Sequence, residues 1–199
     1  LVEKISGLDF AKYVKKNIFD VCGMNNSTFE YNPELVKKTL PDVREENGKL
    51  NEANKFQMLL LLSKNYSSGG SSLITTVDDF SKFADELASG YILSDKAIKE
   101  MATPYISETP FNETVQEYSK SSFEYGYGYG VRVRKVTSHN IPVGEFGWDG
   151  ATGSYCLIDP INKISIVMGM TVQNWPSYVK DLHIRIVERI YDEITKKAH

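Results

Sequence analysis

Apolar residues recur at helical spacing through the first half of the chain. One helix is expected after Gly7, where Asp9 can act as its N-cap and four apolar side chains share one face: Phe10, Tyr13, Val14 and Ile18. This helix should end near Cys22-Gly23-Met24, because a glycine commonly closes a helix. Residues 25–56 are polar and weakly periodic, which predicts a loop with one short helix at 33–38.

Two further helices are predicted before Pro104. The first begins at Thr76-Val77-Asp78-Asp79, which resembles a capping box with Asp in place of Glu. We expect its two aspartates to act in helix capping rather than as an acid pair. It ends at Gly90 and carries one apolar stripe: Val77, Phe80, Phe83, Ala84 and Leu87. The second should run from Asp95 to about Ala102, with Ser94 as its N-cap.

From Tyr125 onward the pattern changes to that of a sheet. Strands are predicted at residues 127–136, 146–148 and 154–158. Residues 164–172 are almost continuously apolar, so this strand should be buried on both faces, and a hairpin turn at residues 159–162 precedes it. Pro176 opens a closing helix whose apolar face is formed by Val179, Leu182, Ile186, Ile190 and Ile194.

This order of elements predicts an α+β fold. Helices come first, a three-stranded antiparallel meander follows, and a helix closes the chain. We assign residues 1–124 to a helical lobe, and residues 125–199 to the antiparallel sheet strands with their closing C-terminal helix.

Composition and charge argue against several classes of protein. The net charge of −3 comes without a basic stripe, so no nucleic-acid partner is expected. No apolar run reaches about 18 residues, so no transmembrane segment is expected. Cys22 and Cys156 are interpreted as buried thiols rather than as a disulfide framework. The three histidines, His139, His183 and His199, share no ligand spacing, and we expect neither a metal nor a cofactor.

Four segments, in their order along the chain, resemble motifs of the β-lactamase and penicillin-binding serine hydrolases. They are Ser6–Phe10 with Ile18-Phe19 and Gly23-Met24, Ser68–Gly70 with Ile74–Phe80, Tyr127–Val131, and Gly147–Gly153 with Ile158–Pro160. The resemblance extends to about residue 175 and is nearest to the class C β-lactamase and carboxylesterase branch. It implies a β-lactamase/transpeptidase-like fold whose N-terminal part is missing here.

The same resemblance implies an acyl-transferring serine hydrolase that forms a covalent acyl-enzyme with an ester, amide or peptide. The family uses an SxxK motif, a YxN or SxN element, and a third motif on a strand, KTG, HxG or WxG. Trp148, Asp149 and Gly150 are similar to the third motif, which implies that they bind substrate. The backbone N–H of Ala151 would then form half of an oxyanion hole. A Trp in first place removes the cation that would hold a β-lactam carboxylate.

The first two motifs are expected upstream of Leu1, since residues 1–7 have the pattern of the last turns of a helix. We therefore expect a C-terminal piece of a longer protein, without the nucleophile and inactive alone. Matches to SxxK at Ser177–Lys180, and to SxN at residues 138–140 and 63–65, are expected to be accidental. About one SxxK match is expected by chance in a chain of this length.

Other interpretations stay open. One is a non-catalytic penicillin-binding-like module that binds peptide or cell-wall-like ligands, and another is a purely structural piece. An upstream SxxK followed by YxN would favour the enzyme. The strand at 164–172 has no charge to protect an edge, so we expect it to pair with the missing N-terminal segment or to self-associate. The resemblance favours an extracytoplasmic location without fixing the compartment.

Overall fold

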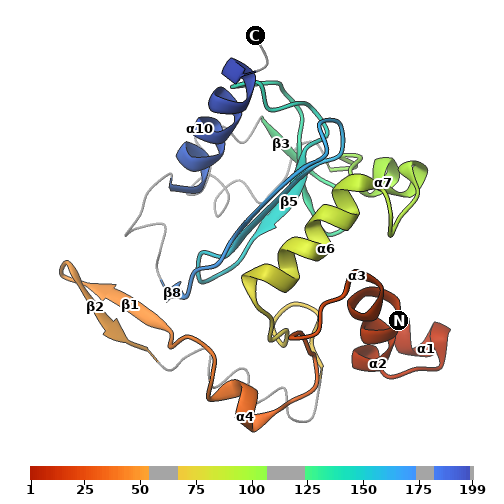
Figure 1. Ribbon diagram of the computed structural model, residues 1–199, viewed down its shortest axis with the longest axis vertical. Helices are drawn as coiled ribbons and strands as arrows, with labels where there is room; N and C mark the ends of the chain where they lie inside the picture. Colours follow the sequence, from red (N-terminus) through yellow and green to blue (C-terminus); the bar gives the residue numbers. More distant parts are fainter. Residues whose placement is uncertain (54–66, 107–123, 174–181, 198–199) are drawn as a thin grey trace.

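The computed structural model describes residues 1–53, 67–106, 124–173 and 182–197 (Figure 1). Apart from one β-hairpin within residues 43–52, helices come first and are followed by mainly antiparallel strands and a last helix. The predicted α+β class is therefore confirmed. No helix in the described ranges is long and apolar enough to cross a membrane.

The N-terminal helices form where the sequence predicts them. A continuous helical run covers residues 10–22 and ends at Gly23, which has a φ of 67°. Its buried side chains pack with Met24 and Phe29. A short helix also forms within the predicted range 33–38. The elements are α1 (Val2–Ser6), α2 (Phe10–Val14), the π-helical turn η1 (Lys15–Phe19), α3 (Asp20–Cys22) and α4 (Pro33–Val36).

A β-hairpin lies where only a loop was expected. β1 (Val43–Glu46) and β2 (Lys49–Glu52) pair in antiparallel fashion around Asn47 and Gly48, whose φ angles are 54° and 78°. Asn-Gly is a strong hairpin signal when alternating apolar residues flank it. Here the flanking strands are mostly charged and β2 is exposed throughout, so the periodicity that would have revealed them is missing.

The two helices before Pro104 begin and end as predicted. They are α6 (Val77–Ser89) and α7 (Asp95–Met101). The Thr76 hydroxyl accepts a hydrogen bond of 3.1 Å from the Asp79 N–H, and Gly90 ends α6 at a φ of 82°. The Ser94 hydroxyl accepts a hydrogen bond from the Ala97 N–H at 3.3 Å. Local capping signals therefore set these boundaries.

The carboxylate of Asp79 does not complete the predicted capping box. It is fully buried and accepts hydrogen bonds from Asn26 N (2.6 Å), Ser27 Oγ (3.0 Å) and Lys82 Nζ (2.9 Å). Burial alone would raise the pKa of this carboxyl, but these hydrogen bonds, with Lys82 foremost, hold the pKa below its usual value. The side chain therefore ties the loop after α3 to the start of α6.

Five antiparallel strands form the central sheet in the order β3-β4-β5-β6-β7. They are β3 (Tyr125–Tyr127), β4 (Arg132–Arg134), β5 (Phe146–Asp149), β6 (Tyr155–Asp159) and β7 (Ile164–Met168). The prediction of one strand at residues 127–136 is wrong, because the chain reverses at residues 128–131 and β3 and β4 form a hairpin. A Cβ at Gly128 would lie 2.1 Å from the Met101 carbonyl oxygen, so this turn needs a glycine where it packs against α7.

The predicted strand at residues 164–172 is also divided. β7 pairs with β6, whereas β8 (Val172–Gln173) pairs in parallel with β1 in a second sheet of order β2-β1-β8. The predicted three-stranded meander is therefore too small. β7 is the last strand of its sheet among the described residues, and Ile166 is its one buried member. Burial on both faces is not found.

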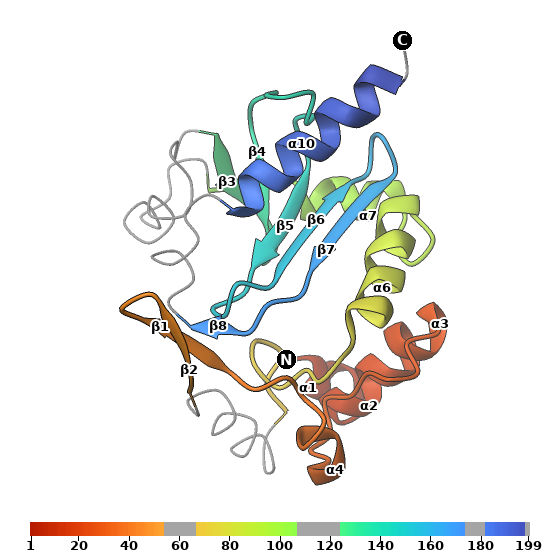
Figure 2. The ribbon, with the colours of Figure 1, turned by 60° about the vertical axis from the view of Figure 1, so that its left-hand side comes forward.

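Helices α6 and α10 (Leu182–Lys197) cover opposite faces of the central sheet (Figure 2). On one face, Ala84, Leu87 and Ala88 of α6 pack with Val133, Phe146 and Ile158. On the other face, Val187 and Tyr191 of α10 pack with Ile141, Leu157 and Ile166. The sheet is thus held between two helices.

The buried face of α10 differs from the predicted one. His183, Val187 and Tyr191 are buried, whereas Ile194 is 44% exposed. The predicted face was based on aliphatic residues, so it missed a buried face that includes a His and a Tyr. Pro176 and Val179, which were predicted to begin the helix, lie outside the described residues.

Candidate functional site

The predicted site residues lie at the end of β5. Trp148 and Asp149 are in register with Cys156 and Tyr155 of β6, but the pairing of β5 with β4 stops at Gly147. The last two residues of β5 therefore extend past β4, which does not line their outer edge. A strand edge without a neighbouring strand can pair with an extended ligand.

A tight turn connects β5 to β6 and carries Gly150 and Ala151. The Gly150 N–H donates to Ser154 O at 2.6 Å, and the Gly153 N–H donates to Gly150 O at 2.9 Å. Ser154 Oγ also donates to Met170 O at 3.0 Å, which fastens the turn to the segment after β7. Ala151 is exposed, and its N–H donates to none of the described residues. The described part of the fold therefore leaves this N–H unused.

Two aromatic rings meet beside the end of β5. Trp148 is 43% exposed, and the Tyr127 ring lies edge-on to it with 5.5 Å between centroids and 70° between planes. Tyr127 belongs to β3, which exchanges hydrogen bonds with Ile106. The sequence did not identify Tyr127 as a site residue. No local spacing encodes this contact, because it depends on how β3, β4 and β5 are aligned.

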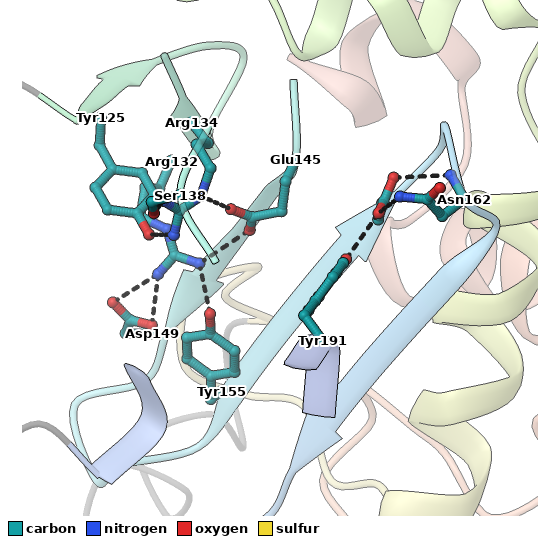
Figure 3. Close-up of polar contacts among 10 residues, drawn as sticks. Tyr125, Arg132, Arg134, Ser138, Glu145, Asp149, Tyr155, Asn162 and Tyr191 are labelled. Atoms are coloured by element: carbon teal, nitrogen blue, oxygen red, sulfur yellow. Dashed lines mark hydrogen bonds and ion pairs between the residues drawn. The ribbon is translucent and has the colours of Figure 1, made fainter. Parts of the chain in front are cut away.

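Asp149 binds a buried arginine (Figure 3), and alternation along the strand places its side chain on the opposite face from that of Trp148. Arg132 Nη1 donates to both carboxylate oxygens of Asp149, at 2.9 Å and 3.1 Å. Arg132 Nη2 donates to Glu145 Oε1 at 3.3 Å and to the Tyr155 hydroxyl at 3.1 Å. Asp149 of the predicted motif is therefore part of an internal charge network.

A second arginine completes this network. Arg134 Nε donates to Glu145 Oε2 at 3.2 Å, Nη1 donates to Ser138 Oγ at 2.8 Å, and Nη2 donates to the Tyr125 hydroxyl. Two cations thus face two carboxylates, because Asp149 belongs to the same cluster. Their mutual attraction and hydrogen bonds offset the large cost of desolvating these charges, so the charges can remain buried.

Burial and charge set the protonation of the groups around the site. Burial alone would lower the pKa of Arg132, but Tyr155 and the two carboxylates raise it above its ordinary value, so the guanidinium stays charged. Burial raises the pKa of Tyr125 to about 12 and also raises that of Tyr155. It raises the pKa of the Cys156 thiol to about 12, so this cysteine is not a thiolate nucleophile at neutral pH.

Of the matches that we expect to be accidental, the structure describes only residues 138–140. Residues 138–140 precede β5 and therefore lie at the opposite end of the strand from Ala151; His139 faces Glu188 of α10 at 3.4 Å. Ser177–Lys180, residues 63–65 and His199 lie outside the described residues. Within the described ranges, no group of His, Cys, Asp and Glu side chains is arranged to hold a metal ion.

Comparisons with known proteins agree with this fold. The family model described as Beta-lactamase matches residues 1–189. A mutant of the simvastatin synthase LovD from Aspergillus terreus superimposes with a TM-score of 0.83 at 18% identity, over 98% of this chain and 52% of that chain. EstCE1, a hydrolase with promiscuous acyltransferase activity, gives 0.72 at 16% identity, over 88% and 49%. The penicillin binding protein from Bacillus halodurans gives 0.63 at 20% identity, over 93% and 52%.

At these identities the solved structures show the fold alone, which is that of β-lactamases and transpeptidases, as predicted. The chain spans about half the length of the solved structures that it matches. No curated protein sequence matches it.

Proposed function

Because the chain belongs to the beta-lactamase family, we propose that residues 148–151 form one wall of the acyl-transfer site of a serine hydrolase or acyltransferase. The proposed reaction moves an acyl group from an ester, amide or peptide through a covalent acyl-enzyme. In this arrangement Trp148 and Gly150 border the acyl group, and Ala151 binds its carbonyl oxygen.

The N–H of Ala151 is the observation that carries this proposal. Attack on a carbonyl carbon places negative charge on the carbonyl oxygen, and a preorganised N–H donor stabilises that charge. The turn after β5 holds Ala151 through the hydrogen bonds of Gly150 and Gly153, while the Ala151 N–H donates to none of the described residues. An oxyanion donor needs both properties.

The surroundings favour an acyl group without a free carboxylate. Arg132 is the cation that binds Asp149 of this motif among the described residues, and its charge is already paired with Asp149 and Glu145. Trp148 and Tyr127 instead offer aromatic surface. The proposed substrate is therefore an ester or amide with a neutral acyl group, rather than a β-lactam whose carboxylate needs a cation.

The proposal assigns the serine nucleophile and its base to a segment other than residues 1–199, which agrees with the half-length coverage of the matched structures. The 199-residue chain alone should then hydrolyse neither p-nitrophenyl acetate nor nitrocefin above the buffer rate. It should also form no adduct with a fluorophosphonate probe. An adduct at any serine of this chain, Ser177 included, would overturn this part of the proposal.

Replacing Ala151 by Pro in the intact protein tests the oxyanion role, because proline has no N–H. Loss of one oxyanion donor should lower kcat by about 100–1,000-fold. Ala151→Gly keeps the N–H and is the matched control, with circular dichroism confirming that both variants fold. Unchanged kcat in a folded Ala151→Pro variant would remove Ala151 from the site. Ester binding without hydrolysis by the wild type would favour the non-catalytic binding module.

We also propose that the outer edge of β7 pairs with another strand, from a second copy or from a further segment of the fold. β7 is the last strand of its sheet among the described residues, and its sequence ISIVM has no charge to protect an edge. Light scattering should show association of the 199-residue chain. A monomer at high concentration with slow amide exchange along β7 would contradict this.

A further inference from the structure

We propose that Arg132 is a positioning residue that, through Asp149, holds the segment Trp148–Ala151 in the orientation required for acyl transfer. The inference rests on the proposed function of that segment. Arg132 is 9% exposed and its two amino groups are bound to Asp149, Glu145 and Tyr155, so it would act through Asp149 rather than by touching substrate.

The two terminal amino groups of Arg132 are hydrogen-bonded and its guanidinium faces lie against tyrosine rings, whereas its buried Nε has no hydrogen-bond partner among the described residues (Figure 3). One amino group donates to both oxygens of Asp149, and the other donates to Glu145 and to the Tyr155 hydroxyl. The rings of Tyr125 and Tyr155 each lie 5.0 Å from the guanidinium carbon. A planar cation held in this way has a defined direction, which a lysine ammonium would lack.

Asp149 can orient the proposed site because it adjoins Gly150 and Ala151 in the chain. It is the last residue of β5, next to Gly150 and two residues before Ala151. On one side, register with Tyr155 of β6 aligns it. On the other side, pairing with β4 has already stopped at Gly147, and the bond to Arg132 continues the connection to β4 through side chains. Removing that bond would let the end of β5 rotate.

Arg134 offers a matched comparison within the same network. It is also buried, binds the same Glu145, and lies over the Tyr125 ring at 4.7 Å. Its remaining hydrogen bonds lead to Ser138, before β5, and to the Tyr125 hydroxyl of β3, and not to Asp149. A change at Arg134 should therefore disturb the buried charges to a similar degree while leaving the end of β5 in place.

The experiment compares Arg132→Lys, Asp149→Asn and their double variant with Arg134→Lys, all in the intact protein. We expect Arg132→Lys and Asp149→Asn each to lower kcat for a p-nitrophenyl ester by about 10–100-fold, because small misplacements at a site have large rate effects. KM should change less than kcat. The kcat of the double variant should be no lower than that of the less active single variant, because both substitutions break the same interaction. Arg134→Lys should leave kcat unchanged.

The amide signal of Ala151 in ¹H–¹⁵N spectra supplies a readout that stability alone would not move. It should shift in Arg132→Lys and Asp149→Asn, and stay in place in Arg134→Lys. An unshifted Ala151 signal in Arg132→Lys, equal loss of kcat in Arg134→Lys, or multiplied losses in the double variant would each overturn the positioning role.

Two outcomes need separate treatment. If Arg132→Lys does not fold, Asp149→Asn decides the question by the same two measurements, because the Asp149 side chain is 28% exposed and tolerates the change better. If the intact wild type hydrolyses no ester, the proposed function fails. The Ala151 signal then decides the positioning role on its own.

Discussion

Replacing Tyr191 by Phe should destabilise the protein while keeping its core packing. Tyr191 of α10 is 2% exposed, and its hydroxyl donates to Asp159 Oδ2 at 2.7 Å. Asp159 is fully buried at the end of β6 and also accepts hydrogen bonds from Ile161 N (2.9 Å), Asn162 N (3.0 Å) and Asn162 Nδ2 (2.7 Å). Figure 3 shows Tyr191 directed at this turn, which it connects to α10.

The size of the effect follows from what the substitution removes. The ring stays, so no cavity forms, and one hydrogen bond to a buried carboxylate is lost. Hydrogen bonds to charged groups contribute about 1.5–3 kcal/mol. Asp159 keeps its other donors, so the loss should lie in the lower part of this range, at about 2 kcal/mol. For 150–250 residues that loss corresponds to a fall in melting temperature of about 4–8 °C, and a longer intact protein should show a smaller fall.

Urea unfolding of the intact protein measures this loss. The midpoint should fall while the m-value stays constant, because the substitution changes stability and not the surface exposed on unfolding. Tyr91→Phe is the control, since Tyr91 is 71% exposed and should tolerate the same change without effect. A Tyr191→Phe variant within about 0.5 kcal/mol of the wild type would show that the bond to Asp159 does not hold α10 on the sheet.

Three further predictions concern stability and reactivity. Burial raises the pKa of Tyr125 to about 12 and also raises that of Tyr155, whereas unfolded tyrosines titrate near 10. Their contribution to stability is therefore complete below about pH 10 and is lost as the pH rises above it. Urea midpoints should fall as the pH rises from about 10. Constant midpoints would contradict this. Gly147→Ala should lower the melting temperature strongly, because its Cβ would lie 1.9 Å from the Cys156 carbonyl oxygen, whereas Gly70→Ala, with no atom within 4 Å, should not. With its pKa raised to about 12, the Cys156 thiol should be alkylated far more slowly at about pH 8 in the folded than in the unfolded protein, and equal rates by mass spectrometry would contradict its burial.

The helices could be predicted because their boundaries depend on neighbouring residues. Thr76 and Gly90 mark the two ends of α6, and Ser94 marks the start of α7, each through contacts within one turn of the chain. Such capping signals lie entirely within a short stretch of sequence. The apolar face of a helix depends instead on what packs against it, which is why α10 buries His183 and Tyr191 rather than the stripe that contains Ile194.

Strand boundaries were harder to predict because alternation does not show where a strand turns back. Residues 127–136 alternate throughout, yet Gly128 must pass close to Met101 and the chain reverses there. Residues 164–172 are almost continuously apolar. The Val43 N–H nevertheless donates to Thr171 O, so the end of this range pairs with the other sheet. In both places a contact from a distant part of the chain overrides a regular local pattern.

The candidate site combines both kinds of information. Its backbone is contiguous, so residues 148–151 could be found as one motif. Arg132 could not, because a charged residue at an alternating position of a strand normally faces solvent. Its burial is tolerable because its charge is paired with Asp149 of β5 and with Glu145, just before β5, and the Asp149 contact spans 17 residues of sequence. The same alignment that makes the burial of Arg132 possible also brings its charge to the end of β5. Any residue that aligns a site of this kind from within the sheet will therefore resemble an ordinary surface charge until the register of the strands is known.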